Sequence, residues 1–171
     1  SYDQKYGIRD YRGGGRSSGR ETAARVAAGA LAKAILTKMG ISIWAHTSQV
    51  GDIKAKDIKK DVIESNSVRC GDKKAAKEMI ALIESVQQEG DSIGGQVSCV
   101  IEGLPVGLGE PAFDKLDAKL AHAMLSIGTV KGIAFGDGFD VITKKGSENN
   151  DSFGIEGDEI ELKSNHSGGI V

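Results

Sequence analysis

A long helical segment that runs through a single glycine into a half-buried strand is the feature that most constrains the fold. Ser18 to Met39 forms the helical segment, and Gly40 stands where a helix-terminating glycine belongs. Ile41 to Val50 then alternates apolar and polar side chains, which is the pattern of a strand with one covered face. A strand buried on both faces of a parallel sheet would be apolar throughout, so the alternation favours an antiparallel sheet.

The helical segment is unusual because nearly all of its inner residues are small. They are Ala23, Ala24, Ala27, Ala28, Gly29, Ala30, Ala32 and Ala34. Small side chains allow neighbouring elements to approach closely, so we expect the helix to be buried between other elements. Ser18 followed three residues later by Glu21 matches a capping box, which predicts that the helix begins at Ser18.

Other segments complete the predicted order of elements. Their periodicity indicates helices at 73–89 and 111–126 and strands at 95–104 and 130–135. The buried face of the helix at 111–126 is marked by Phe113, Leu116, Leu120 and Met124. Residues 139–144 and 160–163 are expected to pair as a hairpin. The polar segments 51–70 and 140–165 are expected to be surface excursions or mobile loops.

The order of elements indicates an α+β fold, a layered sandwich of helices packed against antiparallel sheets. The chain has 171 residues, which is enough for one domain with its own core, and we expect residues 1–171 to form a single domain. No predicted strand is followed by a G-x-G-x-x-G loop, so a dinucleotide site of the Rossmann type is not supported.

Composition narrows the range of partners. The formal net charge is −2, so there is no polybasic footprint for nucleic acid, and no apolar run approaches the roughly 20 residues of a membrane span. Cys70 and Cys99 form no C-x-x-C pair and no metal-ligand pattern. We expect two reduced thiols in a cytoplasmic protein, with no metal site.

The segment Tyr11 to Thr22 carries the clearest chemistry. Gly13 to Gly15 allow the backbone to approach a ligand and to expose successive N–H groups, and a helix start adds the positive end of its dipole. Arg12, Arg16 and Arg20 add guanidinium groups suited to phosphate. These residues predict a phosphate or carboxylate site. The alternative is a flexible glycine loop with solvated arginines.

A longer signature surrounds this segment. Tyr6 to Ala23, with the sequence YGIRDYRGGGRSSGRETA, resembles the arginine–serine signature of the chorismate synthase family. The resemblance continues in order through Glu89–Gly95, Gly107–Pro111, Phe113–Ala118, Gly136–Phe139 and Ser164–Gly169. Residues 51–88 are the least diagnostic part of the chain.

The resemblance implies both a fold, an α+β core of the chorismate synthase type, and a reaction. Members of this family remove phosphate and a ring hydrogen from 5-enolpyruvylshikimate 3-phosphate by anti-1,4-elimination. The product is chorismate, on the shikimate pathway to the aromatic amino acids. The implied cofactor is reduced FMN, and the implied partners are the substrate and further copies of the chain in a homotetramer.

The resemblance also assigns roles to residues. The implied FMN contacts are Arg16, Ser17, Ser18, Gly128 and Thr129. Arg20 would face the anionic groups of the substrate. Ser18 would in addition have a catalytic role in support of a proton-relay histidine, a role that competes with its predicted place in the capping box.

The three histidines receive different interpretations. His46 lies in a predicted strand and His122 in a predicted helix, so both are expected to be structural or surface residues. His166 lies in a glycine-rich block of the resemblance, and a role near the flavin is the hypothesis for this residue.

Two motifs of the family are absent from the chain. It contains no Gly-Glu-Ser-His-Gly and no Arg-His-Asp, and so lacks both of the histidines implied as proton donors to flavin and phosphate. We interpret the sequence as a central core of the enzyme, truncated at both ends. The alternatives are a non-catalytic phospholigand-binding module and an oligomerisation module.

The chain alone is therefore expected not to turn over the substrate. Anaerobic incubation with 5-enolpyruvylshikimate 3-phosphate and reduced FMN should give no chorismate above an enzyme-free control. Robust formation of the conjugated diene of chorismate would contradict this expectation.

Overall fold

The computed structural model describes residues 1–157 and 159–169 of the chain. Contacts divide it into two compact units, one formed by Ser1–Ala27 with Pro105–Val171 and the other by Ala28–Leu104. The first unit thus consists of two segments of the chain, one that precedes the second unit in the sequence and one that follows it. The expectation of a single domain over residues 1–171 stays a prediction.

The unit Ala28–Leu104 is built on a three-stranded sheet in the order β2-β1-β3. Its strands are β1 (Ser42–Val50), β2 (Ile53–Lys54) and β3 (Gly95–Glu102). β1 pairs antiparallel with both neighbours, with Ile43 opposite Ile101 in β3, and a bulge between Thr47 and Gln49 shifts the register. The prediction of an antiparallel sheet from the alternation in β1 is confirmed.

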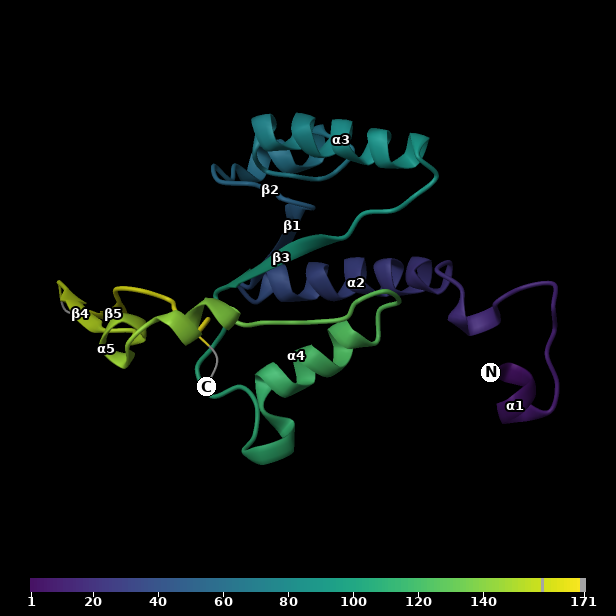
Figure 1. Ribbon diagram of the computed structural model, residues 1–171. Coiled ribbons are helices and arrows are strands. Elements are labelled where there is room, and N and C mark those ends of the chain that lie inside the picture. Colours follow the sequence, from purple (N-terminus) through teal and green to yellow (C-terminus); the bar gives the residue numbers. More distant parts are fainter. Residues whose placement is uncertain (158, 170–171) are drawn as a thin grey trace. The chain divides into compact units, whose positions relative to one another are not determined.

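The helix α3 (Lys73–Gln88) supplies most of the core of this unit. The core cluster consists of Val50, Cys70, Ala75, Ala76 and Met79, of which Cys70 and Met79 are completely buried. Apolar residues of β2 and the adjoining loop pack against the cluster. In Figure 1 the strands run between α3 and the part of α2 (Glu21–Lys38) that belongs to this unit. The predicted α+β class, with helices against antiparallel sheets, is confirmed.

Asp72 fixes the start of α3. Its Oδ1 accepts hydrogen bonds from the amides of Lys74 and Ala75 at 2.9 and 3.1 Å. Its Oδ2 accepts from the amides of Lys56 and Asp57 at 3.1 and 3.4 Å. These backbone donors, that of Lys56 first, lower the pKa of Asp72 to about 2. One carboxylate therefore caps the helix and ties the preceding loop to it.

The segment 51–70 contributes to the core despite its polar composition. It contains a 3₁₀ helix, η2 (Lys60–Ser65), in which Val62 and Ile63 are buried. The Asn66 side chain bonds to the backbone carbonyls of Val62 and Cys70 and to the amide of Cys70, which turns the chain inward. The surface excursion expected here thus carries three buried residues that its charge pattern did not reveal.

The helix α2 confirms the long predicted helix but differs from two expectations. It begins at Glu21 and not at Ser18, because the Glu21 carboxylate bonds to Arg25 and does not reach back to the Ser18 amide as a capping box requires. None of its residues, all of which the structure describes, is buried. The expectation of a helix buried between other elements is wrong, because alanine side chains bury too little apolar area to dictate packing.

The unit formed by Ser1–Ala27 and Pro105–Val171 consists mainly of short elements. They are α1 (Tyr2–Tyr6), η1 (Gly15–Ser17), η3 (Ala112–Asp114), α4 (Leu116–Leu125), η4 (Gly138–Thr143), α5 (Gly146–Asn149), β4 (Phe153–Glu156) and β5 (Glu159–Leu162). The strands β4 and β5 form an antiparallel pair. Figure 1 shows these elements along the colour scale, from α1 in purple to the strands near the yellow end.

The helix predicted at 111–126 is shorter than expected. Only α4 is α-helical, because η3 precedes it as a separate 3₁₀ turn. The four residues predicted for its buried face divide into two half-buried ones, Leu116 and Leu120, and two exposed ones, Phe113 and Met124.

Two strand predictions for this unit are wrong. Residues 130–135 pair with no strand in the described part of the chain. The hairpin expected between 139–144 and 160–163 does not form, because the first segment becomes η4 and β5 pairs with β4. The partner nearer in sequence is favoured since closing a shorter loop costs less conformational entropy. The mobility expected for 140–165 stays a prediction, and Asp158 within that range lies outside the described residues.

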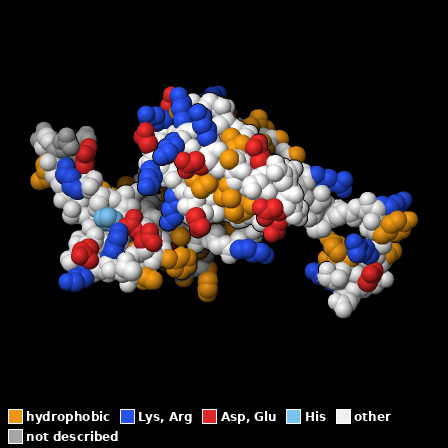
Figure 2. Space-filling model, turned by 45° about the horizontal axis from the view of Figure 1, so that its top comes forward, with side chains coloured by type: hydrophobic (Ala, Val, Ile, Leu, Met, Phe, Trp, Pro, Cys, Tyr) orange, Lys and Arg blue, Asp and Glu red, His pale blue; other side chains and the backbone are white. Residues whose placement is uncertain are grey.

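The described surface is mixed in character. On the face shown in Figure 2, basic and acidic side chains are interspersed, and apolar side chains reach the surface between them. Large apolar residues of α2 and of the turn directly after it are among those exposed, with Leu31, Ile35 and Met39 at 72%, 62% and 66%. Among the described residues, no helix is long and apolar enough to cross a bilayer.

Replacing Met79 with alanine is expected to destabilise the unit Ala28–Leu104 by about 2–5 kcal/mol, because a fully buried side chain is removed and a cavity remains. The matched control is Met39→Ala, at an exposed methionine, which should change the free energy of unfolding by less than about 0.5 kcal/mol. Urea denaturation followed by circular dichroism measures both. Equal effects would contradict the position of Met79 in the core.

Candidate functional site

The glycine–arginine segment folds as a tight turn ahead of α2. The Ser17 amide donates to the Gly14 carbonyl at 3.1 Å, and the Ser18 amide donates to the Gly15 carbonyl at 3.2 Å. The Ser17 hydroxyl donates to the same Gly14 carbonyl at 2.6 Å. Gly15 has a φ of +54°, in the left-handed region that favours glycine. The glycines therefore serve first to form the turn.

The backbone amides around the start of α2 are already engaged. Those of Glu21, Thr22 and Ala23 donate to the carbonyls three residues earlier at 3.1–3.2 Å. Those of Ser17 and Ser18 close the preceding turn. These five amides are therefore not free to bind an anion, and the nest expected from the amides of Gly13 to Gly15 stays a prediction.

The three arginines of the segment differ in their engagement. Arg12 donates from Nε and Nη2 to the two carboxylate oxygens of Asp10 at 2.9 and 3.0 Å, which lowers the pKa of Asp10. Arg16 and Arg20 are exposed, and among the described residues neither forms an ion pair. The segment thus presents two uncompensated guanidinium groups, and not the three predicted.

Ser18 is half-buried at the junction of this turn and α2. Its Oγ accepts a long hydrogen bond, 3.4 Å, from the amide of Arg20. A hydroxyl that accepts one hydrogen bond retains its own hydrogen for donation. Ser18 is thus not part of a capping box, although its Oγ is engaged by the Arg20 amide, and its contact with a ligand stays a prediction.

Arg25 joins the first turns of α2 to the end of α4. Its Nε lies 2.8 Å from Oε2 of Glu21. Its Nη1 donates to the Ser126 hydroxyl at 2.7 Å, and its Nη2 is 3.3 Å from the Ser126 carbonyl oxygen. Sequence reasoning did not identify Arg25. The four-residue spacing from Glu21 predicts the ion pair, but no local signal brings Ser126 beside it.

The turn that follows α4 has an unusual backbone. The Ile127 amide donates to the Met124 carbonyl at 3.0 Å, and the Val130 amide donates to the Ile127 carbonyl at 3.3 Å. Thr129 within the turn has a φ of +71°. A β-branched residue rarely adopts positive φ, and such strained positions are concentrated at functional sites.

The predicted flavin contacts therefore belong to two segments of one unit, and a side chain connects the helices next to these segments. Arg16 to Ser18 precede α2, and Gly128 and Thr129 follow α4. The side chain of Arg25 links the helices at these two ends. The arrangement couples a cationic turn to a strained turn, which suits a ligand that carries phosphate.

His166 lies in a second polar cluster of the same unit. Its Nδ1 is 2.6 Å from Oδ2 of Asp137, and Lys144 binds the same oxygen. These contacts, that with Lys144 first, lower the pKa of Asp137. The Asp137 amide also donates to the His166 carbonyl at 2.8 Å. Gly136 has a φ of +57°, and a Cβ there would overlap that carbonyl oxygen, so the contact of the two loops requires glycine.

Asp151 holds the loop that carries His166. Its Oδ1 accepts hydrogen bonds from the Ser164 hydroxyl and the His166 amide, both at 2.7 Å. Its Oδ2 accepts from the Ser167 amide at 2.9 Å. These bonds, that from the Ser167 amide first, lower the pKa of Asp151 from its ordinary 3.8 to about 2. His166 is thus fixed by both Asp137 and Asp151.

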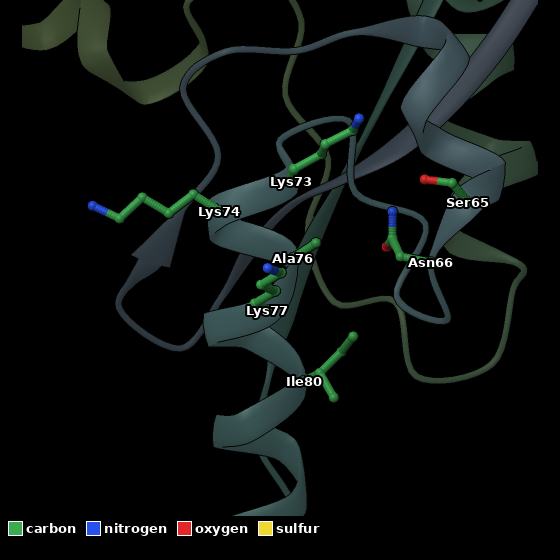
Figure 3. A pocket seen from close by; sticks show the side chains of 7 residues that line it. All are labelled: Ser65, Asn66, Lys73, Lys74, Ala76, Lys77 and Ile80. Atoms are coloured by element: carbon green, nitrogen blue, oxygen red, sulfur yellow. The ribbon is translucent and has the colours of Figure 1, made fainter.

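The other unit contains a lysine-lined hollow beside α3. It is lined by Ser65, Asn66, Lys73, Lys74, Ala76, Lys77 and Ile80. Figure 3 shows the Lys74 side chain extending away from the others. The Asn66 amide group is bonded to backbone groups, and the Ser65 hydroxyl donates to the Val62 carbonyl at 2.6 Å. The hollow therefore offers flexible charges but few polar groups free to orient a ligand.

His46 and the two cysteines belong to the unit Ala28–Leu104. His46 is buried, and its ring stacks on Trp44 with centroids 5.8 Å apart, which confirms the structural interpretation of this histidine. Cys70 and Cys99 are both free. In the part of the chain that the structure describes, no group of three or more His, Cys, Asp or Glu side chains could hold a metal.

Comparison with known proteins identifies the family. The family model described as chorismate synthase matches residues 1–171. The chain belongs to the chorismate synthase family. The resemblance inferred from the arginine–serine signature is thereby confirmed.

Similar proteins agree with this assignment. The chain is 60% identical to the chorismate synthase of Phocaeicola vulgatus and 56% identical to that of Bacteroides thetaiotaomicron, with 99% of the chain covered in each case. It spans about half, 49%, of the length of these curated relatives. A crystal structure of a chorismate synthase superposes with a TM-score of 0.81 at 32% identity, covering 91% of this chain and 53% of that one.

Asp151 makes the His166 loop sensitive to strong acid but not to mild acid. Because the folded chain lowers the pKa of Asp151, its stabilising effect is complete above pH 3.8 and is lost as the pH falls toward 2. In NMR exchange measurements, the His166 and Ser167 amides should stay protected at about pH 4.5 and lose protection below about pH 3.

The Asp151→Asn variant tests the cause of this transition. It removes the titrating group and keeps one acceptor oxygen, so protection of the His166 and Ser167 amides should be weaker and nearly independent of pH. A loss of protection already near pH 5 in the unchanged chain would contradict the assignment to Asp151.

Proposed function

We propose that the chain supplies the core of a chorismate synthase, which converts 5-enolpyruvylshikimate 3-phosphate to chorismate and phosphate by anti-1,4-elimination with reduced FMN. The observation that carries the proposal is that Arg16 and Arg20, which flank Ser17 and Ser18 in the sequence, are exposed and form no ion pair among the described residues. Both the substrate and the cofactor carry phosphate, which guanidinium groups and hydroxyl donors bind well. Membership of the family supports the identity of the reaction.

The residues proposed to hold FMN are Arg16, Ser17, Ser18, Gly128 and Thr129. Their chemistry fits the cofactor, because the Arg16 guanidinium and the Ser18 hydroxyl, which accepts a hydrogen bond and keeps its own hydrogen, suit its phosphate. The positive φ of Thr129 supports a ligand contact at the second turn. The chemistry that reduced FMN supplies when bound is reversible electron donation, which agrees with a reaction that has no net redox change.

Arg20 is proposed to face the anionic groups of the substrate. As phosphate departs, negative charge grows on the leaving oxygen, and a fixed cation there stabilises the transition state more than the ground state. Ser18 is proposed to act through its hydroxyl hydrogen, which would orient a proton-relay histidine. Its half-buried position at the start of α2 supports a defined orientation for that hydroxyl.

His166 is proposed to lie near the flavin. Its support is the fixed position of the loop, because Asp137 binds the ring and Asp151 binds the backbone amide. A histidine held in this way has one ring nitrogen engaged by a carboxylate and the other free to meet a ligand.

We also infer that the chain assembles with further copies, as a homo-oligomer, in the cytoplasm. Leu31 and Ile35 of α2 and Met39 in the turn directly after it follow one another at four-residue intervals and are largely exposed, which supports an apolar contact surface. The free state of Cys70 and Cys99 supports a reducing compartment.

Flavin binding provides the test of the proposed site. Arg16→Gln removes an uncompensated charge and should weaken binding of reduced FMN about tenfold, because a charge-assisted hydrogen bond to phosphate is lost. Anaerobic fluorescence titration of the chain measures the dissociation constant.

The matched control is Arg12→Gln, four residues earlier in the same segment. Arg12 is already bound to Asp10, so its loss should change the dissociation constant much less. Equal effects of the two substitutions would show only a dependence on net charge, and would contradict a specific contact at Arg16.

A further inference from the structure

We propose that Arg25 is a positioning residue that holds the Ser126–Thr129 turn against the start of α2 and so fixes the two flavin-contacting segments relative to each other. The inference rests on the proposed function, since those segments are the proposed FMN contacts. Arg25 itself is not proposed to touch the cofactor or the substrate.

All three nitrogens of the Arg25 guanidinium lie within hydrogen-bond distance of a partner. Nε bonds to the Glu21 carboxylate at 2.8 Å, which orients the planar group within α2. The two terminal nitrogens then reach the hydroxyl and the carbonyl of Ser126 at 2.7 and 3.3 Å. The Arg25 and Glu21 side chains are 39% and 28% exposed, so solvent screens this contact only in part. A lysine has a single donor head and cannot make all three contacts.

Ser126 is also held by hydrogen bonds to the last turn of α4. Its hydroxyl accepts from Arg25 and donates to the Ala123 carbonyl at 2.5 Å, so both roles of the hydroxyl are in use. Its amide lies 3.3 Å from the carbonyls of both His122 and Ala123 at the end of α4. A cation at this end also complements the helix dipole. Ser126 is therefore a fixed point between α4 and the turn.

The strained turn lies directly beyond this fixed point. Thr129 keeps a φ of +71°, a conformation that persists only when the surroundings determine it. Among the described residues, the side-chain contacts that tie this turn to α2 are those of Arg25 with Ser126. Without them, the turn is free to relax toward ordinary backbone angles, and Gly128 and Thr129 would move away from the position set by α2.

Hydrogen exchange of the chain tests the first half of this inference. Arg25→Lys should accelerate amide exchange in residues 126–130 about fivefold or more, while the melting temperature of the chain changes little. The matched control is Arg69→Lys, because Arg69 also pairs with a glutamate, Glu64, at 2.5 Å but belongs to the other unit. Unchanged exchange in residues 126–130 of Arg25→Lys would overturn the proposal.

Titration with reduced FMN tests the second half. Arg25→Lys should weaken binding about tenfold, and Ser126→Ala should do the same, because each removes one side of the same contact. In the double variant the losses should not add, so Arg25→Lys should cost less than about threefold once Ser126 is alanine. Additive losses, or exchange that rises without any loss of affinity, would overturn the positioning role.

The proposed function and this inference fail in different ways. If the unchanged chain does not bind reduced FMN, the proposed flavin site is contradicted and the flavin half of the inference falls with it. The exchange comparison of Arg25→Lys with Arg69→Lys then still decides whether Arg25 holds the turn.

Discussion

The contact of Arg25 with Glu21 and Ser126 is the interaction on which the candidate site depends most. It joins two segments that are far apart in sequence and that each carry half of the proposed flavin contacts. Among the described residues of this unit, which consists mainly of short elements, it is the side-chain contact that ties α2 to the end of α4. The three donor contacts of one planar group give it a geometric specificity that a single ion pair lacks.

The site and the main apolar core belong to different units of the chain. The core cluster around Met79 and Cys70 lies within Ala28–Leu104, whereas the arginine–serine turn, the turn after α4 and His166 belong to the other unit. The latter is organised largely by polar contacts, in which the carboxylates of Asp137 and Asp151 each collect several donors. The arrangement of this unit therefore depends on hydrogen-bond geometry more than on buried apolar area.

The sequence predicted the helices and strands that have a clear periodicity, and its arginine–serine signature predicted the family. The strand at 41–50 and the helix at 73–89 were predicted from local periodicity, and the structure has them as β1 and α3. Three predictions were wrong: the burial of α2, the strand at 130–135 and the partner of β5. Each depends on which distant element supplies the packing or the pairing. In the site, Arg16 and Ser18 follow from the signature. Arg25 does not, since its role comes from Ser126, which lies 101 residues away.

The central claim is that one flavin site is formed jointly by the turn before α2 and the turn after α4. A ¹⁵N NMR titration of the chain with reduced FMN under anaerobic conditions tests it most directly. If both turns form one site, the amides of Arg16 to Ser18 and of Gly128 to Thr129 should shift together along one binding curve, while those of Lys73 to Lys77 stay unchanged. Shifts centred on Lys73 to Lys77, or on only one of the two turns, would contradict it.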